Sequence, residues 1–441
     1  MQGEREIAVR GLMEIFEKKS YGNVAMRRIL ASHGHLDRTQ KAFVTLVVTG
    51  CIRNLIQIDH IIGNFSQTPV TKMKPAIINI LRISVYQLRF MDKVPTFAVC
   101  NEAVDLAKKM GFMRLSGFVN GVLRNIARNI DRLDVPDTLE IKYSCAPWIV
   151  QHFMDELGEA ATEELLANIC KPPDVTLCVN TRKISTDELL KILANEGIEV
   201  MRGDLAKDAL VVTKTSDIAG LESFRKGYYH VMDQAAMLAV QAVVLNASSR
   251  IIDVCAAPGG KSFLAAYLAQ NSQILSRDVH NFKLKQLREG AKRLGLDGRV
   301  IVQKWDATEF DEKLCETADL VIVDAPCSGL GTMRRRPDIK LFKQKESIRE
   351  LEDLQRNILA SSWQYVKPGG KLVYSTCTIN RRENMDKCTW FLQQFPFKPV
   401  DFSENVPDVP EFASARDGYL QILPQHFDTD GFFISIFERC K

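Results

Sequence analysis

The chain lacks the features that mark membrane proteins, secreted disulfide scaffolds and zinc-binding modules. No uninterrupted apolar run approaches the roughly 20 residues that a transmembrane helix needs, and the segment MQGEREIAVRGLMEIF opens on charged residues instead of the apolar core of a signal peptide. Its 11 cysteines include no Cys-x-x-Cys pair, which argues against a zinc knuckle and against a disulfide framework. We therefore expect a cytoplasmic protein that binds no metal and keeps its cysteines reduced and mostly buried.

Excess charge of one sign is also absent from the chain as a whole, although charge is unevenly distributed along it. The 441 residues carry a net charge of only +4. Residues 1–130 contain 19 Lys and Arg against 9 Asp and Glu, whereas residues 131–441 contain 39 against 45. A basic front end favours a polyanionic partner such as RNA, because phosphates that are neutralised release their counterions. A basic surface that serves solubility alone is the alternative.

The patterns along the chain change twice, which fits a length of two or three domains. Residues 1–130 are helical in pattern throughout. For example, Pro75 is placed to begin a helix whose apolar stripe runs from Ile77 to Leu88. Residues 131–230 contain a connector and then two short strand-like runs, VTLCVNTRK and ALVVTK, around a helical segment that Ser185 and Glu188 begin as a capping box. This middle region predicts a small α/β module.

From residue 231 onward, strand-like apolar runs alternate with helical patterns. The runs lie at residues 250–254, 272–278, 299–303, 318–324 and 371–375. Because they are apolar without strict alternation, they fit parallel strands that helices cover on both faces. The last runs, GYLQILP and GFFISIF, alternate and predict a closing antiparallel hairpin. Residues 231–441 therefore predict a doubly wound sheet, whose ligands bind beyond the carboxyl ends of the strands.

The stretch IIDVCAAPGGKSF ends in Gly-Lys-Ser, as a triphosphate-binding loop does. That motif needs a glycine five places before Gly260, where this chain has Cys255. What remains is a strand followed by a tight turn with Pro258, Gly259 and Gly260, whose backbone a ligand can approach closely. Asp278 ends the next strand and suits the hydroxyls of a ribose. The pattern predicts a nucleoside-bearing cofactor and leaves a dinucleotide and S-adenosylmethionine both open.

Two cysteines follow strands of the predicted sheet. VDAPCSGLGTMRRRPD places Asp324 and Cys327 just past one buried strand, and LVYSTCTINRREN places Cys377 just past another. Two thiols at the ends of neighbouring strands, with a carboxylate beside one, predict a nucleophile site. The alternative is a core role, since cysteine is among the most buried residue types. We expect that core role for Cys51, Cys100, Cys145, Cys170, Cys178, Cys315, Cys388 and Cys440.

Together, DVCAAPGGKS, DAPCSGLGTMRRRPD and YSTCTI resemble the RNA cytosine-C5 methyltransferases. ILRISVYQL, PTFAVCNEAVDLAKK and GFVNGVLRN resemble the RNA-binding NusB-like fold. The chain as a whole resembles the bacterial RsmB/Sun family, which methylates a cytidine of 16S ribosomal RNA. The resemblance spans essentially all 441 residues. It implies a multidomain protein with an all-α NusB-like bundle (1–130), a small α/β module (131–230) and a Rossmann-like methyltransferase domain (231–441).

The resemblance also implies roles for individual residues. Cys377 is the nucleophile that attacks cytosine C6, and Cys327 assists collapse of the adduct. Asp324 contacts the cytosine and lies near S-adenosylmethionine, whose ribose Asp278 holds and whose adenine Asp306 contacts. The residues that wrap this cofactor are Cys255, Ala256, Ala257, Pro258, Gly259, Gly260 and Lys261. The expected partner is small-subunit ribosomal RNA and the expected state a monomer. A transfer-RNA substrate, a P-loop nucleotidase and a non-catalytic RNA-binding protein of the same fold stay open.

Basic residues follow the Cys327 loop, namely Arg334, Arg335, Arg336 and Lys340. Their position suits contacts to an RNA backbone, and the alternative is a solvated basic turn. The chain departs from the family pattern at four positions, namely Cys178, Arg277, Arg381 and Arg382. None of these departures touches the proposed reacting groups. We expect Cys178, Arg381 and Arg382 to bear on RNA contacts and so on which cytidine is the target.

Overall fold

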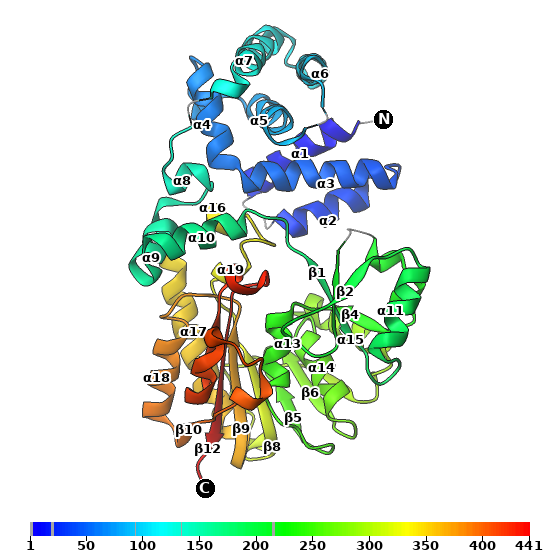
Figure 1. Cartoon of the computed structure of the whole chain (residues 1–441), viewed down its shortest axis with the longest axis vertical. Helices are drawn as coiled ribbons and strands as arrows, with labels where there is room; N and C mark the ends of the chain where they lie inside the picture. Colours follow the sequence, from blue (N-terminus) through cyan, green and yellow to red (C-terminus); the bar gives the residue numbers. More distant parts are fainter. Residues whose placement is uncertain (1–2, 19–21, 93, 134, 214–216) are drawn as a thin grey trace. The chain divides into compact units, whose positions relative to one another are not determined.

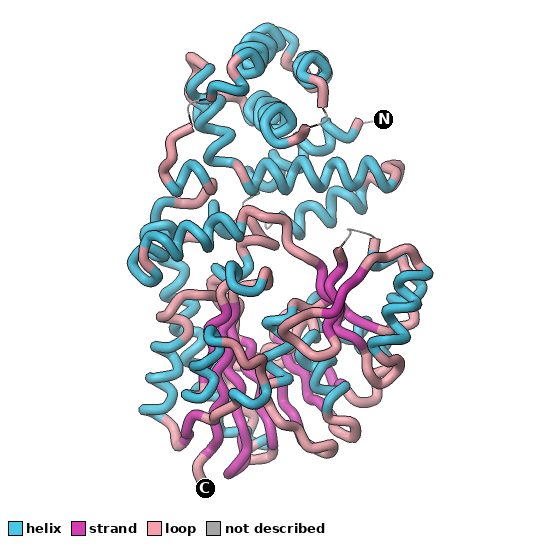
Figure 2. Tube along the Cα trace, in the orientation of Figure 1, coloured by secondary structure: helices cyan, strands magenta, loops and turns pink. Residues whose placement is uncertain are grey.

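The computed structural model describes residues 3–18, 22–92, 94–133, 135–213 and 217–441. Its contacts divide the chain into two units (Figures 1 and 2). The first unit comprises Met1–Lys171 together with Met333–Lys343, and the second comprises Pro172–Thr332 and Gln344–Lys441. The domain boundaries at residues 130 and 230 stay predictions.

The first unit consists of helices. They are α1 (Glu4–Lys18), α2 (Gly22–Ser32), α3 (Arg38–Arg53), α4 (Leu55–Phe65), α5 (Pro75–Phe90), α6 (Thr96–Lys109), α7 (Ser116–Arg128), α8 (Leu139–Lys142), α9 (Pro147–Leu157), α10 (Glu159–Ile169) and α16 (Ile339–Phe342). Pro75 is the first residue of α5, as predicted, because a proline at this position gives up no helical hydrogen bond. Ile77, Leu81 and Val85 of its predicted stripe are buried.

One apolar core joins α1 to α7, and the short segment 333–343 contributes to it from far along the sequence. Leu341 and Phe342 pack against this core, and the Phe342 ring meets the Phe16 ring edge to face at 5.8 Å. Among the described helices, none is on its own long and apolar enough to span a membrane, while the bent pair Arg38–Arg53 and Leu55–Phe65 passes that test of length and composition jointly, across a bend of 78°.

The second unit begins with a four-stranded antiparallel sheet. Its strands are β1 (Val175–Val179), β2 (Val200–Arg202), β3 (Ala209–Val212) and β4 (Tyr229–Val231), in the order β2-β3-β1-β4, with helices α11 (Thr186–Asn195) and α12 (Glu222–Arg225). Ser185 and Glu188 form the predicted capping box of α11. Lys214, the last residue of the predicted run ALVVTK, lies outside the described residues. The small α/β module is confirmed, with two more strands than the sequence indicated.

A larger mixed sheet follows. Its strands are β5 (Ile251–Asp253), β6 (Ile274–Asp278), β7 (Val300–Lys304), β8 (Ala318–Asp324), β9 (Val366–Thr376), β10 (Phe397–Pro399), β11 (Tyr419–Ile422) and β12 (Phe432–Arg439). The order is β10-β12-β9-β8-β5-β6-β7, and β11 pairs with β12. Strands β5 to β9 are parallel, whereas β10, β11 and β12 pair antiparallel. The predicted antiparallel pairing of the last two runs is therefore confirmed.

Two apolar cores cover the two faces of this sheet. The helices are α13 (Gln234–Gln241), α14 (Gly260–Leu268), α15 (Asn281–Leu294), α17 (Glu346–Ser362), α18 (Met385–Gln394) and α19 (Pro424–Phe427). Ile251 packs into the core of α13 to α15, while its neighbour Ile252 packs into the core of α17 and α18. The alternation follows from the period of two along a strand. It explains why these strands are apolar without interruption.

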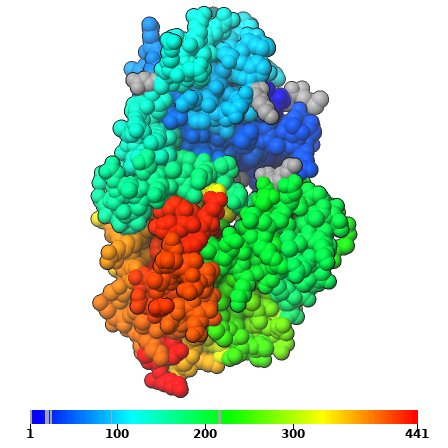
Figure 3. All heavy atoms as spheres, viewed as in Figure 1, coloured from blue at the N-terminus to red at the C-terminus, as the bar shows by residue number. Residues whose placement is uncertain are grey.

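The C-terminal segment closes the second unit on the α13 side. Phe402 and Phe412 are buried in the core of that face, and the Asn405 amide donates a hydrogen bond of 3.3 Å to the Ala242 carbonyl. In Figure 3 the orange and red atoms of this segment adjoin the green atoms of the small module. The expected core placement of the remaining cysteines is wrong for Cys315 and Cys440, which are exposed.

Candidate active site

The strand order reverses between β5 and β8, and the candidate site lies there. From β5 the chain continues to β6 and β7 on one side, while β8 and β9 lie on the other side of β5. Loops that leave the carboxyl ends of two such strands diverge, which opens a crevice at this point of doubly wound sheets. The glycine turn follows β5, the Cys327 loop follows β8 and the Cys377 loop follows β9.

The glycine turn connects β5 to α14. Gly259 has a φ of +118°, which L side chains rarely adopt, and a Cβ there would collide with the Phe263 ring. Asp253, at the end of β5, is fully buried and accepts a hydrogen bond of 2.7 Å from the Ser262 hydroxyl. Burial raises the pKa of Asp253 to about 7. The turn is thus fixed by backbone geometry and by a carboxyl group beneath it.

Lys261 links this turn to the end of β8. Its Nζ lies 2.8 Å from Asp324 Oδ2, and Ser375 on β9 donates to Asp324 Oδ1 at 2.9 Å. The Lys261 side chain is 8% exposed and its ammonium also lies over the Phe432 ring. A nearly buried ammonium paired in this way neutralises Asp324 and is not directed to a phosphate. The carboxylate of Asp324 therefore joins three neighbouring strand ends.

The two predicted cysteines face each other. Cys327 Sγ lies 3.3 Å from Cys377 Sγ, because β8 and β9 are parallel neighbours with Asp324 opposite Ser375. The two loops also meet through their backbones, since the Gly331 amide donates to the Cys377 carbonyl at 3.1 Å. A Cβ on Gly331 would collide with the Gly431 carbonyl, so this approach requires glycine.

Burial and neighbouring groups change how strongly the Cys327 thiol holds its proton. The pKa of the Cys327 thiol is well above its usual range, because of the hydrogen bond with Cys377, because of burial and because of the nearby negative charge of Glu383. Cys327 therefore keeps its proton more strongly than a free cysteine does. At this separation a protonated Cys327 can donate a hydrogen bond to the Cys377 sulfur.

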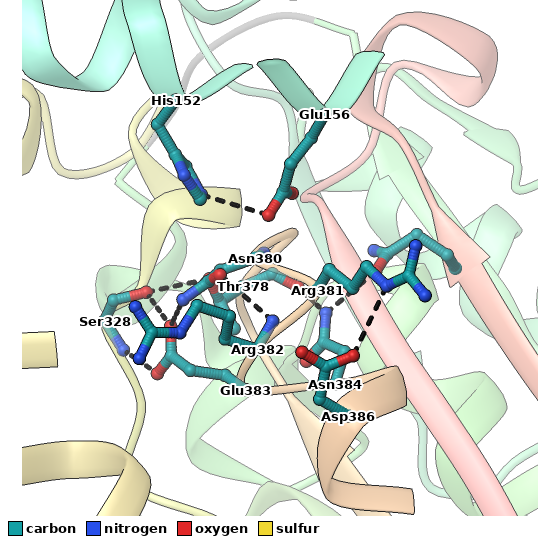
Figure 4. A network of polar contacts seen from close by, with 11 residues as sticks. His152, Glu156, Ser328, Thr378, Asn380, Arg381, Arg382, Glu383, Asn384 and Asp386 are labelled. Carbon is teal, nitrogen blue, oxygen red and sulfur yellow. Dashed lines mark hydrogen bonds and ion pairs between the residues drawn. The ribbon is translucent and has the colours of Figure 1, made fainter. Parts of the chain in front are cut away.

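A buried hydrogen-bond network centred on Glu383 connects the residues that follow the two cysteines in the sequence (Figure 4). Its carboxylate accepts hydrogen bonds from the Ser328 amide at 2.8 Å and from the Ser328 hydroxyl. It also accepts from Asn380 at 2.9 Å and from Gln355 on α17 at 3.0 Å. Ser328 and Thr378 share a further hydrogen bond of 2.8 Å between their hydroxyls. These residues follow the two cysteines directly, so the network fastens one cysteine loop to the other.

Sequence patterns did not identify this network as part of the site. Ser328, Thr378 and Asn380 are single polar residues inside loops, and their burial depends on contacts between distant segments. The one available signal was that Glu383 and Asn384 follow the Thr-Cys motif. Asn384 accepts from the Thr376 hydroxyl at 2.6 Å and donates to the Thr378 carbonyl at 3.0 Å, which fixes the strand end on both sides of Cys377.

The two remaining acidic residues predicted to bind the cofactor lie near the same edge of the sheet. Asp278 ends β6, the parallel neighbour of β5, and its Oδ1 accepts from the His280 amide at 2.9 Å. Asp306 follows β7 and is exposed, and its Oδ1 accepts from the Thr308 amide and hydroxyl. These bonds lower the pKa of Asp306. Burial raises the pKa of Cys255 well above its usual range, so this third thiol of the region stays neutral.

The basic run after the Cys327 loop, predicted to contact RNA with a solvated turn as the alternative, is partly buried. Lys340 is fully buried and donates to the Tyr143 carbonyl at 2.7 Å, while its own carbonyl accepts from the Ala146 amide. Arg334 is 3% exposed, and its carbonyl accepts from Arg53. Arg335 and Arg336 are half-buried. A segment that packs into the helical unit buries its charges, so Arg334 and Lys340 are structural anchors here.

The departures from the family pattern are placed as follows. Arg277 is 2% exposed, pairs with Asp311 and lies over the Trp305 ring, so its buried charge is compensated. Cys178 is buried in the core. Arg381 and Arg382 are both exposed, and their partners are Asp386 at 3.3 Å and Glu352 at 3.0 Å. Within the described ranges, no three His, Cys, Asp or Glu side chains are placed to hold a metal ion.

Comparisons with known proteins identify all three parts of the chain. Residues 240–438 match the family model of the 16S rRNA methyltransferase RsmB/F, residues 2–128 match the NusB family, and residues 146–219 match the ferredoxin-like domain of RsmF/B-like methyltransferases. The crystal structure titled PH0851 is similar with a TM-score of 0.81 and 26% identity, and covers 100% of this chain and 99% of its own. The structure titled NSun6 from Pyrococcus horikoshii with SFG, at 21% identity and a TM-score of 0.60, shares the fold over 67% of this chain and 98% of its own.

Curated relatives align over nearly the whole length. The probable ribosomal RNA small subunit methyltransferase B of Bacillus subtilis is 38% identical over 98% of this chain and 97% of the relative. The ribosomal RNA small subunit methyltransferase B of Vibrio cholerae is 30% identical over 96% of this chain and 95% of the relative. With this identity along the full length, and with paired cysteines at the ends of adjacent parallel strands, the chain belongs to the RsmB/F family of 16S rRNA methyltransferases.

Proposed function

We propose that this protein transfers a methyl group from S-adenosylmethionine to C5 of a cytosine in small-subunit ribosomal RNA, as a cytoplasmic monomer. The observation that carries the proposal is the 3.3 Å separation of Cys327 Sγ and Cys377 Sγ beside a glycine turn. The names of the relatives from Bacillus subtilis and Vibrio cholerae supply the ribosomal RNA substrate. Transfer RNA is the alternative substrate.

Cys377 acts as the nucleophile. C5 of cytosine is a poor nucleophile until a thiolate adds to C6, when a bond forms between Cys377 Sγ and C6 and the electron pair of the C5=C6 bond moves to C5. Asp324 would contact the amidine edge of the ring, where its carboxylate can accept a hydrogen bond from the exocyclic amine. Lys261, at 2.8 Å from Asp324, balances the charge of that carboxylate. The strand end beside Cys377 is already fixed, so little motion is needed for attack.

The glycine turn and the acidic residues fit S-adenosylmethionine. When bound, this cofactor supplies an electrophilic methyl group. Cys255 to Lys261 provide a turn whose backbone, without side chains at Gly259 and Gly260, leaves room for a ligand. Asp278 is placed at the end of the next parallel strand for the ribose hydroxyls, and Asp306 for the adenine end.

Release of the product depends on Cys327. The C5–H electron pair restores the C5=C6 bond and the proton goes to water, while the bond between C6 and Cys377 Sγ breaks with its electron pair on sulfur. Cys327, which keeps its proton, donates a hydrogen bond to the departing sulfur of Cys377. The target base has to leave its stack to reach this site, and Arg335 and Arg336 are our candidates for contacts to its backbone.

The helical unit offers a second surface for RNA. Phe97 on α6 is 71% exposed beside a hollow of about 450 Å³. Arg124 and Arg128 of α7 line the same hollow and are exposed. An exposed aromatic ring flanked by two guanidinium groups suits an unstacked base and its phosphates.

Methyl transfer from labelled S-adenosylmethionine to ribosomal RNA, with mapping of the modified base, tests this function. We expect Cys377→Ala to abolish transfer while cofactor binding is retained, because only the nucleophile is lost. We expect Cys327→Ala to accumulate a covalent protein–RNA adduct, visible as a shifted band that resists denaturant. Normal turnover of Cys327→Ala without any adduct contradicts these roles, and labelling of transfer RNA in place of ribosomal RNA favours the alternative substrate.

A further inference from the structure

Glu383 is a buried carboxylate that bonds to both cysteine loops, and the proposed reaction steps assign it no role. Its side chain is 0% exposed, and its carboxylate receives four hydrogen bonds, of which two come from Ser328 in the Cys327 loop and one from Asn380 in the Cys377 loop. The fourth donor is Gln355, which also donates to the Pro326 carbonyl at 3.0 Å. Hydrogen bonds to a buried carboxylate are stronger than neutral ones.

The backbone of Glu383 is held as well as its side chain. The Tyr374 hydroxyl, on β9, donates to the Glu383 carbonyl at 2.7 Å. Its neighbour Asn384 connects Thr376 to Thr378 around Cys377. The carboxylate therefore has a fixed position relative to both strands, and it cannot move without moving both cysteine loops.

We propose that Glu383 is a positioning residue for methyl transfer: it fastens the Cys327 loop to the Cys377 loop and holds a negative charge close to Cys327. This inference rests on the proposed function for its catalytic part. In the adduct, Cys327 then carries the S–H that donates to the departing Cys377 sulfur.

The charged groups around Cys327 and Cys377 support this role of Glu383. Glu383 and Cys377 both favour the neutral form of Cys327, and the Tyr374 phenol also interacts with this thiol. Lys387 on α18 interacts with Glu383 and with Glu352 and is itself buried, with a pKa that burial lowers. The carboxylate of Glu352, on α17, accepts a hydrogen bond of 3.0 Å from the Arg382 guanidinium. Glu352→Gln is therefore a matched control that removes a neighbouring carboxylate.

Glu383→Gln in the full-length protein tests the proposal with two measurements. The amide keeps the shape and one acceptor oxygen but removes the charge. In rapid-quench assays with ribosomal RNA, we expect single-turnover methyl transfer to be little changed, steady-state turnover to fall about tenfold, and the covalent adduct to accumulate. By mass spectrometry, we expect the midpoint pH for iodoacetamide labelling of Cys327 to shift downward, because loss of the nearby negative charge favours the thiolate.

The controls separate positioning from folding. Glu352→Gln should leave the adduct level and the labelling midpoint as in the wild type. Ser328→Ala, which removes the hydroxyl bonds to Glu383 and Thr378 and no charge, should raise the adduct level without moving the midpoint, and it serves where Glu383→Gln does not fold. Equal loss of single and steady-state turnover with an unmoved midpoint would show that Glu383 only supports the fold.

The labelling measurement needs no substrate, so it distinguishes this inference from the proposed function. A wild-type protein that forms no RNA adduct, but whose Cys327 midpoint still shifts in Glu383→Gln, overturns the methyl-transfer role and leaves the control of Cys327 by Glu383 intact. A wild-type protein that forms the adduct, with no change of either readout in Glu383→Gln, overturns the inference alone.

Discussion

At the scale of single residues, carboxylates organise the edge of the sheet where the thiols lie. Asp253 lies beneath the glycine turn, Asp324 joins three strand ends, and Glu383 fastens the two cysteine loops. Each is held by hydroxyl, amide or ammonium donors from a different strand or helix. The two sulfur atoms lie 3.3 Å apart, and the groups that hold their two loops set this separation.

Asp253 gives a prediction about stability. Its pKa is raised from the ordinary value to about 7 because it is buried, so in the folded protein the carboxyl resists ionisation. The stability that this group contributes is fully present below about pH 4, where the unfolded chain is also protonated, and it is lost as the pH rises through about 7. Asp253→Asn cannot ionise and keeps an acceptor for Ser262.

We therefore expect Asp253→Asn to gain about 2 kcal/mol over the wild type between pH 5 and pH 8, in free energy of unfolding from denaturant titrations. The exposed carboxylate of Asp105 provides the control variant Asp105→Asn. A difference between Asp253→Asn and the wild type that is the same at pH 5 and pH 8 would show that Asp253 does not ionise in this range.

Residue patterns predicted the position of the thiols but not their support. Cys327 and Cys377 could be brought together from sequence, because parallel neighbouring strands end at the same edge. Glu383 could not, since burial of a polar side chain depends on donors from α17 and from another loop. The prediction that Lys340 contacts RNA failed for a similar reason. A basic residue in a charge run normally faces solvent, and only its packing reveals the Tyr143 carbonyl as its partner.

At the scale of secondary-structure elements, long and strongly patterned segments were predictable and short ones were not. Strand β8 is apolar on both faces because helices cover both, and β5 to β9 were each visible as a run rich in apolar residues. The strands β2, β4 and β10 have three residues each, too few for any alternation to show. They form because a neighbouring strand offers unpaired backbone groups.

Helices α6 and α7 give a prediction about RNA binding. Phe97, Arg124 and Arg128 are exposed, so their replacement should leave the unfolding temperature unchanged. We expect Phe97→Ala to weaken binding of ribosomal RNA about tenfold, from the loss of one stacked base. Each of Arg124→Ala and Arg128→Ala should reduce the slope of log affinity against log salt by about 1. Fluorescence anisotropy across a salt series measures both.

The exposed ring of Phe282 on α15, in the second unit, provides the matched control for the aromatic variant. Phe282→Ala should bind the RNA as the wild type does. Equal affinity of Phe97→Ala and the wild type at every salt concentration would remove this surface from the RNA-binding site.

At the scale of the whole molecule, the first unit is discontinuous in sequence. Residues 333–343 leave the second unit just after the Cys327 loop and belong to the first unit. Hydrogen bonds anchor them there, among them those from Lys340 to the Tyr143 carbonyl, from Ala146 to the Lys340 carbonyl, from Trp148 to the Lys343 carbonyl and from Arg53 to the Arg334 carbonyl. Phe342 adds an apolar contact to the helical core.

Phe342→Ala tests how much this segment contributes to the stability of the helical unit. Because the ring is half-buried against the core, we expect a loss of about 1–2 kcal/mol in the stability of the helical unit. Calorimetry of the full chain should show a lower transition for that unit alone. Leu46→Ala, at an exposed position of α3, is the control. If the second unit's transition also moves, the segment is not specific to the helical unit.

The placement of residues 333–343 has a consequence for how the chain is made. A ribosome releases residues 1–171 long before it reaches position 343. The nascent helical unit therefore lacks residues 333–343 while more than 160 further codons are translated. During that interval the core residues that Leu341 and Phe342 contact stay uncovered, so the helical unit completes its packing only after residue 343 is made.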